Sequence, residues 1–317
     1  MLTDKQDIRL PGGPASIGRG ATGSSRSVRR RLRDVGTPLL LLAPALAVLV
    51  GFRLLPIGES IRLSFTDWDG FSSPQWVGLD NYKALVGDER FTSALLHNLE
   101  IVLAMPVWIF LPYAIAWALH GGIPGWRFFR FAFFVPVVIS PAVIGVYYGL
   151  VLEPDGPFND LLRVLGLGGL TRAWLNDPAF AMPVVIAIII WSTLGVGVMI
   201  FLGGLANLDQ EQVDAARVDG ASGWQIQRHV VFWQLLPLIE FWAVLTMIAS
   251  FTAFFPLIYA LTSGGPGYAT YTVDYALYQA AFNRGELGYA SSIGVVLLLV
   301  MAVIGLLQLR LLRGRRA

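Results

Sequence analysis

Six long apolar runs recur along this 317-residue chain, and they constrain its fold more than any other feature. A run of about 20 apolar residues is long enough to cross the hydrocarbon core of a bilayer as an α-helix. Because the chain is 55% hydrophobic and only 14% charged, an ordinary soluble domain is excluded. The runs cover residues 38–57, 99–119, 131–152, 179–206, 235–262 and 288–309. We therefore predict an all-α polytopic membrane protein with six transmembrane helices.

Lysine and arginine are distributed unevenly among the segments that flank these runs. With the N-terminus inside, 16 of the 23 basic residues lie before the first run, after the last run or in the two joining segments on the same side. Cytoplasmic segments of membrane proteins carry the excess of Lys and Arg. The pattern therefore predicts that both termini, and the segment between the fourth and fifth runs, are cytoplasmic.

Residues 1–37 are rich in Gly, Ser and Arg. This composition predicts a disordered, basic cytoplasmic tail that meets anionic membrane lipid, followed by a six-span domain over 38–317. A cleaved signal peptide is the alternative, since Ala45-Leu-Ala47 imitates a small-residue cleavage site. That site lies inside the apolar run instead of after it, which favours the uncleaved tail.

The polar segment between the fourth and fifth runs carries helix-capping signals. Asp209 followed by Gln212 is typical of a capping box, and Gly220 is a natural helix stop. Ser222 followed by Gln225 begins a second short helix in the same way. We predict two short capped helices that form a rigid knob on one face of the bilayer, with a plain polar hairpin between two spans as the alternative.

The string Asp214-Ala-Ala-Arg-Val-Asp-Gly220 resembles the EAA loop of permease subunits in binding-protein-dependent ABC importers. The family usually has Glu at the position of Asp214 and proline at the position of Trp233, while Pro237 matches its second proline. In that family the loop docks on the cytoplasmic ATPase. The resemblance implies that residues 207–237 form an EAA loop with a coupling role. It assigns the ATPase contact to Glu211, Asp214, Ala215, Ala216, Asp219 and Gly220. The alternative for Ala215 and Ala216 is that they are present only because alanine is a good helix former.

Further strings resemble the carbohydrate-uptake, maltose-permease-like branch of these importers. They are Trp76-Val-Gly-Leu-Asp-Asn-Tyr82, Asn159, and Leu261-Thr-Ser-Gly-Gly-Pro266, and the match runs in order from about 38 to 310. The resemblance implies the type I ABC importer permease fold in a bacterial or archaeal cytoplasmic membrane. It implies as partners a second homologous permease subunit, two ATP-binding cassette ATPase subunits and an extracytoplasmic sugar-binding protein. ATP and Mg would be bound by the ATPases, so this chain would need no cofactor.

The apolar runs contain almost no ionisable side chains. Asp, Glu, Lys, Arg and His are absent from 101–119, 131–152, 179–208, 241–273 and 287–309. Ion-coupled transporters usually need such a group within the membrane. Uphill transport by this chain would therefore need an external motor.

No residue pattern predicts an enzyme. The two lysines, Lys5 and Lys83, do not follow a glycine-rich phosphate loop, so the chain has no ATP-binding motif of its own. The chain has no cysteine, and its three histidines are far apart, without metal-ligand spacing. The charge distribution does not suggest nucleic acid as a partner.

Two runs carry the aromatic and hydroxyl side chains that could hold a sugar. By resemblance, maltose-type permeases bind sugar with these two spans. The candidates are Trp191, Ser192, Thr193, Ser250, Phe251, Thr252 and Phe254. Packing of the bundle core is the alternative role for the aromatic ones. Since the spans offer no buried cation, a neutral sugar is favoured over sn-glycerol 3-phosphate, and another polyol is a further possible substrate. A non-translocating scaffold for ATPase subunits and a downhill facilitator are the alternative functions.

Proline and glycine interrupt several of the runs. Such interruptions are common where transporter helices bend around a pathway, although both residues are frequent in membrane helices generally. The positions are Pro106, Pro112, Pro136, Pro141, Gly195, Gly197 and Pro256.

Overall fold

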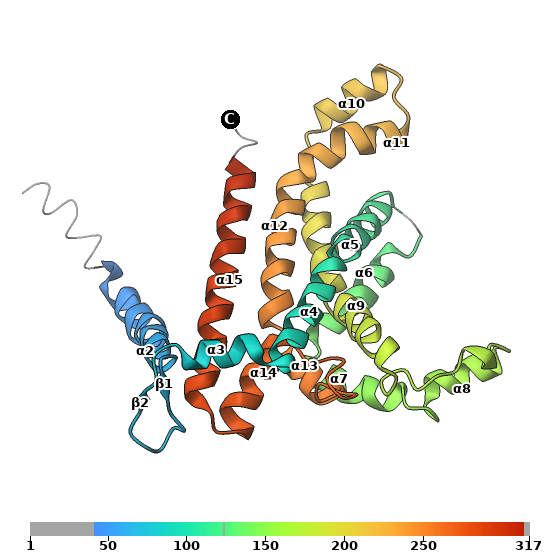
Figure 1. Ribbon diagram of the computed structural model, residues 1–317. Helices are drawn as coiled ribbons and strands as arrows, with labels where there is room; N and C mark the ends of the chain where they lie inside the picture. Colours follow the sequence, from blue (N-terminus) through green and yellow to red (C-terminus); the bar gives the residue numbers. More distant parts are fainter. Residues whose placement is uncertain (1–40, 123, 314–317) are drawn as a thin grey trace, which may run out of the picture. The chain divides into compact units, whose positions relative to one another are not determined.

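A computed structural model describes residues 41–122 and 124–313, which are mostly helical (Figure 1). The chain divides at Gly58 into two structural units, and the second, from Glu59 onward, contains the sites described below. Within the described residues the elements are η1 (Val50–Leu54), α2 (Leu55–Leu63), β1 (Thr66–Asp67), β2 (Gln75–Trp76), α3 (Asp80–Gly87), α4 (Glu89–Leu103), α5 (Met105–His120), α6 (Trp126–Val138), α7 (Pro141–Val151), α8 (Pro157–Val164), η2 (Gly168–Leu170), α9 (Pro178–Leu205), α10 (Gln210–Val218), α11 (Gly223–Ile226), η3 (Gln227–Val231), α12 (Phe232–Thr252), α13 (Phe255–Leu261), α14 (Val273–Tyr278), η4 (Gln279–Asn283) and α15 (Leu287–Arg313). The predicted basic tail over 1–37 lies outside the described residues.

Five helices of the described chain are long and apolar enough to cross a membrane, and a bent pair makes a sixth candidate. The five are Leu41–Leu63, Glu89–His120, Pro178–Leu205, Gly223–Thr252 and Leu287–Gln308. This confirms the predicted all-α membrane fold.

The second span begins at Glu89, well before the predicted start at residue 99. Its first part, α4, is amphipathic, with Phe91, Ala94, Asn98 and Ile101 buried on one face. Polar residues on the opposite face lower the average hydropathy of this part. The apolar run in the sequence therefore marks only the second half of the helix.

The third predicted span is a bent pair of helices, with the break at one of the predicted interruptions, Pro141. α6 and α7 meet at an angle of 102°. Ile139 and Ser140 between them are extended, with ψ of 133° and 136°, and Pro141 opens α7. A residue before proline avoids the α-helical region, and proline is tolerated in the first turn of a helix, so the break falls here.

The fifth predicted span ends earlier than expected, because α12 stops at Thr252 and α13 begins at Phe255. The buried side chain of Asn98 bonds the backbone near this break. Its Nδ2 donates to the Ser250 carbonyl oxygen at 2.5 Å, and its Oδ1 accepts from the Val273 N–H at 2.9 Å. Asn98 is only 1% exposed, so it satisfies two buried backbone groups that water does not reach.

The helix α9 packs against α5, α6 and α12, and half of the residues in its most apolar stretch are buried. Gly195 and Gly197 do not interrupt it, because α9 runs unbroken from Pro178 to Leu205. A Cβ at Gly197 would lie 2.8 Å from the Cβ of Pro112 and 3.1 Å from the ring of Trp242. Gly197 therefore serves close packing between helices and not bending.

The short elements lie at the two ends of this bundle. α10 and α11 lie at one end of α12, and α3, α13 and α14 lie at the other end (Figure 1). The second end also carries the antiparallel pair of β1 and β2, in which Thr66 faces Trp76.

Candidate functional site

The polar segment between α9 and α12, residues 209–224, is called the coupling loop below. Its first helix, α10, begins after Asp209, whose carboxylate accepts a hydrogen bond from the Glu211 N–H at 3.1 Å. Asp209 therefore caps the helix, but the predicted capping box with Gln212 is wrong, because the Asp209 carboxylate accepts from the N–H of Glu211 and not from that of Gln212. The side-chain amide of Gln212 donates a hydrogen bond to the Asp209 carboxylate at 2.8 Å. The backbone N–H of Asp209 donates instead to Oε1 of Gln234 on α12 at 2.9 Å.

The predicted stop of α10 at Gly220 is confirmed. Gly220 has a φ of +79°, in the left-handed region that favours glycine. Its N–H donates to the Arg217 carbonyl oxygen at 3.0 Å, and the Ala221 N–H donates to the Ala216 carbonyl oxygen at 3.0 Å. This pair of bonds is the Schellman arrangement, which satisfies the last carbonyl groups of a helix.

The second helix has the predicted capping box. The Ser222 N–H donates to Gln225 Oε1 at 2.7 Å, and the Gln225 N–H donates to Ser222 Oγ at 3.4 Å. The prediction that this helix is short is wrong, because it continues without a break from Gly223 to Thr252. Trp233 has the backbone N–H that a proline at this position would lack, so the helix passes through it.

One side of α10 is exposed in the described part of the chain. Glu211, Asp214, Ala215 and Val218 are exposed and follow the spacing i, i+3, i+4, i+7 that aligns residues on one side of a helix. Val218 is 88% exposed although it is apolar. These four residues are called the free face below. The sequence prediction missed Val218, and a helical projection of residues 210–218 contains the information that finds it.

The opposite side of α10 packs against the bundle. Val213 is only 5% exposed, and Ala216 packs against the core. The two predicted alanines therefore differ in environment, with Ala215 on the free face and Ala216 on the packed side.

The tip of the coupling loop is open. Asp219 and Gly220 are exposed, and a Cβ added at Gly220 would meet no atom within 4 Å. Asp214 forms an ion pair with Arg217, with 2.7 Å between Oδ1 and Nη1, and both side chains are mostly exposed. An exposed pair of this kind contributes about 0–1 kcal/mol to stability, so Asp214 can exchange it for another contact at little cost.

The seven candidate sugar contacts do not form one cluster. Trp191 on α9 is 37% exposed, and its ring packs edge-on against Tyr148 of α7 with centroids 5.3 Å apart. Thr193 and Phe254 meet elsewhere, through Trp108 of α5. The Trp108 Nε1 donates to Thr193 Oγ1 at 2.8 Å, and its ring lies 5.6 Å from that of Phe254.

The candidate hydroxyl groups bond to the backbone of their own helices. Ser192 donates to the Ile189 carbonyl oxygen at 2.9 Å, and Ser250 donates to that of Met247 at 2.7 Å. Such bonds to the preceding turn are common for Ser and Thr within membrane helices. Ser250 is buried, and so is the neighbouring Phe251.

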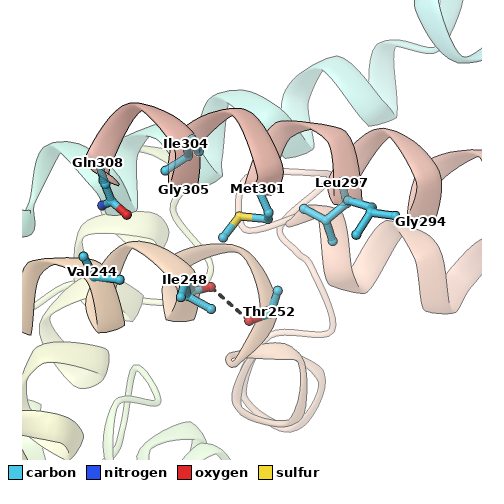
Figure 2. Close-up of a pocket in the computed structure, with 10 residues that line it drawn as sticks. Val244, Ile248, Thr252, Gly294, Leu297, Met301, Ile304, Gly305 and Gln308 are labelled. Carbon is cyan, nitrogen blue, oxygen red and sulfur yellow. Dashed lines mark hydrogen bonds between the residues drawn. The ribbon is translucent and has the colours of Figure 1, made fainter. Parts of the chain in front are cut away.

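Thr252 lies in an apolar groove of about 610 Å³ between α12 and α15 (Figure 2). Its hydroxyl donates to the Ile248 carbonyl oxygen at 2.9 Å, the bond drawn as a dashed line in Figure 2. Thr252 and Trp191 are the two exposed members of the candidate set. The sequence prediction missed Trp108 and Tyr148, because neither follows from spacing along the chain.

One carboxyl group lies just after a charge-free run of the sequence. Asp274 directly follows the charge-free run 241–273 and accepts hydrogen bonds from Thr272 Oγ1 at 2.6 Å and from the Tyr275 N–H at 2.9 Å. Burial raises the pKa of this carboxyl above its ordinary value, against the effect of these bonds. In the described part of the chain, His, Cys, Asp and Glu side chains form no group of three or more that could hold a metal ion.

The helical membrane bundle with a capped, exposed loop at one end fits the permease expected from the sequence. Residues 84–317 match the family model described as the binding-protein-dependent transport system inner membrane component. The chain belongs to this family of ABC transporter permeases, which are transport proteins and not enzymes.

Individual relatives agree with this assignment. The chain is 36% identical to the probable ABC transporter permease protein YurN of Bacillus subtilis over 278 residues, which cover 86% of this chain and 94% of YurN. It is 31% identical to the multiple sugar-binding transport system permease protein MsmF of Streptococcus mutans, over 90% of this chain and 98% of MsmF. These relatives confirm the resemblance to sugar-transport permeases.

The fold is also similar to that of a solved transporter. The structure is that of a bacterial alginate ABC transporter in complex with an alginate pentasaccharide-bound periplasmic protein. The TM-score is 0.75 at 21% sequence identity, and the match covers 88% of this chain and 96% of that one. This likeness confirms the permease fold.

Proposed function

We propose that this chain is one of two homologous permease subunits of an ATP-driven importer that moves a sugar across a bacterial or archaeal cytoplasmic membrane. Two ATPase subunits bind ATP and Mg and supply the energy, and an extracytoplasmic binding protein delivers the sugar. Both termini and the coupling loop lie in the cytoplasm, as the distribution of basic residues indicates.

The free face of α10 is the observation that carries this proposal. Val218 is 88% exposed on the same side of α10 as Glu211, Asp214 and Ala215, so this side offers a partner an apolar side chain next to charged ones. Beside it, Asp214 and Glu211 offer charged contacts and Ala215 permits close approach. In the proposed complex this face, with Asp219 and Gly220 at the tip, fits a groove of the ATPase.

The coupling loop is bonded to α12, so a movement of the loop is transmitted to the membrane spans. Gln234 on α12 accepts from the Asp209 N–H at 2.9 Å and donates to Gln212 Oε1 at 3.3 Å, which holds the start of α10 against α12. The second helix of the loop is itself the beginning of the fifth span. When the ATPases close, α10 therefore moves with α9 and α12, and these helices carry Trp191 and Thr252.

The sugar as substrate rests on the relatives and on the chemistry of the path. Aromatic rings pack against the apolar faces of sugars, and Trp191 presents an exposed ring on α9. Relatives such as MsmF are named as sugar-transport permeases. We propose Trp191 and Thr252 as the first contacts, because they are the two candidates with exposed side chains.

The substitution Gly220→Asp tests the coupling role. Asp at a φ of +79° strains the turn and adds a charge at the tip, so ATP-dependent uptake by the reconstituted complex should fall to background while the chain still inserts. The matched control is Gly166→Asp in the loop after α8. Gly166 has a φ of +74° and also has no atom within 4 Å of an added Cβ. Wild-type uptake by Gly220→Asp, or equal losses in both variants, would contradict the proposal.

A further inference from the structure

A second pocket lies beside the root of the coupling loop. It has a volume of about 420 Å³ and is formed by the end of α5, the start of α6 and the last turns of α9. Its polar lining comes from His120, Arg130 and Trp126, while Leu119, Met199 and Leu202 supply much of its apolar lining.

The charge of this pocket is not compensated. None of the described residues that line it is acidic, and Arg130 forms no ion pair within the described part of the chain. A guanidinium group and an imidazole N–H at one site suit a phosphate oxygen. The pocket therefore has the lining of a site for an anionic group attached to an apolar body.

The surroundings of the pocket indicate a lipid environment. Along α6 the large side chains of Phe128, Phe131 and Phe134 are exposed. Trp126 stands at the start of this helix, and the guanidinium of Arg127 lies 5.5 Å from its ring centroid. Tryptophan and arginine at the end of an apolar, phenylalanine-rich helix are typical of the membrane–water interface.

We propose that this pocket binds an anionic phospholipid of the cytoplasmic leaflet. The phosphate contacts Arg130 and His120, the glycerol region packs on Trp126, and an acyl chain lies along Met199 and Leu202. Basic pockets between transmembrane helices on the cytoplasmic side bind anionic headgroups in this way. The assignment to the cytoplasmic leaflet rests on the orientation proposed above.

The position of the pocket links the lipid to coupling. The lining residues Gly203 and Ala206 lie six and three residues before Asp209, where the coupling loop begins. His120 also lines a neighbouring cavity of about 350 Å³, which Val213 and Arg217 of α10 share. The bound lipid therefore braces the root of the loop, and ATP-driven uptake should depend on anionic lipid.

The test uses the whole transporter complex in nanodiscs that contain phosphatidylglycerol at low abundance in phosphatidylcholine. Lipid retained by the complex is measured by native mass spectrometry. Arg130→Gln should lower retention of phosphatidylglycerol about tenfold, the loss expected when one hydrogen bond between charged groups is removed. Arg127→Gln, which removes the same charge on the same helix outside the pocket, should retain it as the wild type does. Equal retention in all three proteins would overturn the proposal.

A second variant fills the pocket without changing its charge. A Cβ at Gly203 meets no atom within 4 Å, so the fold accommodates Gly203→Leu, and its side chain should displace the lipid and lower retention by a similar factor.

Soluble glycerol phosphate should not compete, because it lacks the acyl chain, and competition would overturn the assignment to a lipid. If Arg130→Gln instead releases the second permease subunit with lipid retention unchanged, the pocket is a protein interface and the proposal is wrong. Lipid retention is measured without transport, so a failure of the proposed lipid site can be distinguished from a failure of the proposed sugar import.

Discussion

The coupling loop and the candidate sugar path are built in opposite ways. In the loop, the polar and charged side chains point away from the bundle, and α10 keeps a free face that includes the exposed Val218. In the path, Ser250 is buried and its hydroxyl bonds backbone of its own helix, and the Ser250 carbonyl is in turn bonded by the buried Asn98 of α4. A surface with unused contacts is suited to a partner, whereas satisfied polar groups mainly hold the helices in place.

The difference shows that residue type alone does not mark a site. Ser250 and Thr252 are both hydroxyl residues on α12, yet the first is buried and the second is exposed in a groove. The predictions below test this contrast, beginning with the change that should have the largest effect.

The substitution Asn98→Leu should have the largest effect, because it leaves the Ser250 carbonyl and the Val273 N–H buried without their partner. Each unsatisfied group costs about 1–3 kcal/mol, so the thermal unfolding temperature and the folded yield should fall strongly. Asn176→Leu, at an exposed position, serves as the control. Unchanged stability in Asn98→Leu would show that the outer end of α12 does not depend on this contact.

The substitution Val218→Ser should lower ATP-dependent uptake about tenfold, because a fully buried valine contributes about 1.5 kcal/mol or more at an interface. The stability of the isolated chain should not change, since Val218 is almost fully exposed in it. Val164→Ser on α8 is the matched control, at 83% exposed. A loss of uptake in both variants, or in neither, would remove Val218 from the free face as a functional contact.

The substitution Trp191→Ala should raise the KM for uptake about fivefold with little change in the assembly of the complex, because an aromatic contact with the sugar is lost. Phe241→Ala, another exposed aromatic position within a span, should leave the KM unchanged. An unchanged KM for Trp191→Ala would leave this ring with a packing role against Tyr148.

The substitution Ser250→Ala should have the smallest effect. Its hydroxyl bonds the Met247 carbonyl oxygen in its own helix, so the free energy of unfolding should change by about 0.5 kcal/mol or less and uptake should be unaffected. A large rise in KM would place Ser250 in direct contact with the sugar and would erase the contrast between the two regions.

Local patterns predicted the coupling loop well. The cap at Ser222 and the stop at Gly220 depend on residues within a few positions of each other, so the sequence contains them. The predicted capping box at Asp209 was wrong, and the actual partner of the Asp209 N–H, Gln234, is distant in sequence and reaches α10 only in the folded chain.

The fold class was predictable and the path was not. Apolar runs reveal most of the spans, and Pro141 marks the bend in the third one, but the break after Thr252 lies beside backbone groups that Asn98 satisfies from a distant part of the sequence. The pairing of Trp108 with Thr193 joins residues 85 positions apart, and no periodicity along the chain indicates it.

The most direct measurement is the accessibility of a single thiol on the free face. The chain has no cysteine, so Val218→Cys introduces a unique one at a fully accessible position. A membrane-impermeant maleimide should leave it unlabelled in intact cells, label it in inverted vesicles stripped of ATPase, and fail to label it once the ATPase subunits are added back. Labelling in intact cells, or labelling that the ATPase does not block, would contradict the proposed coupling role.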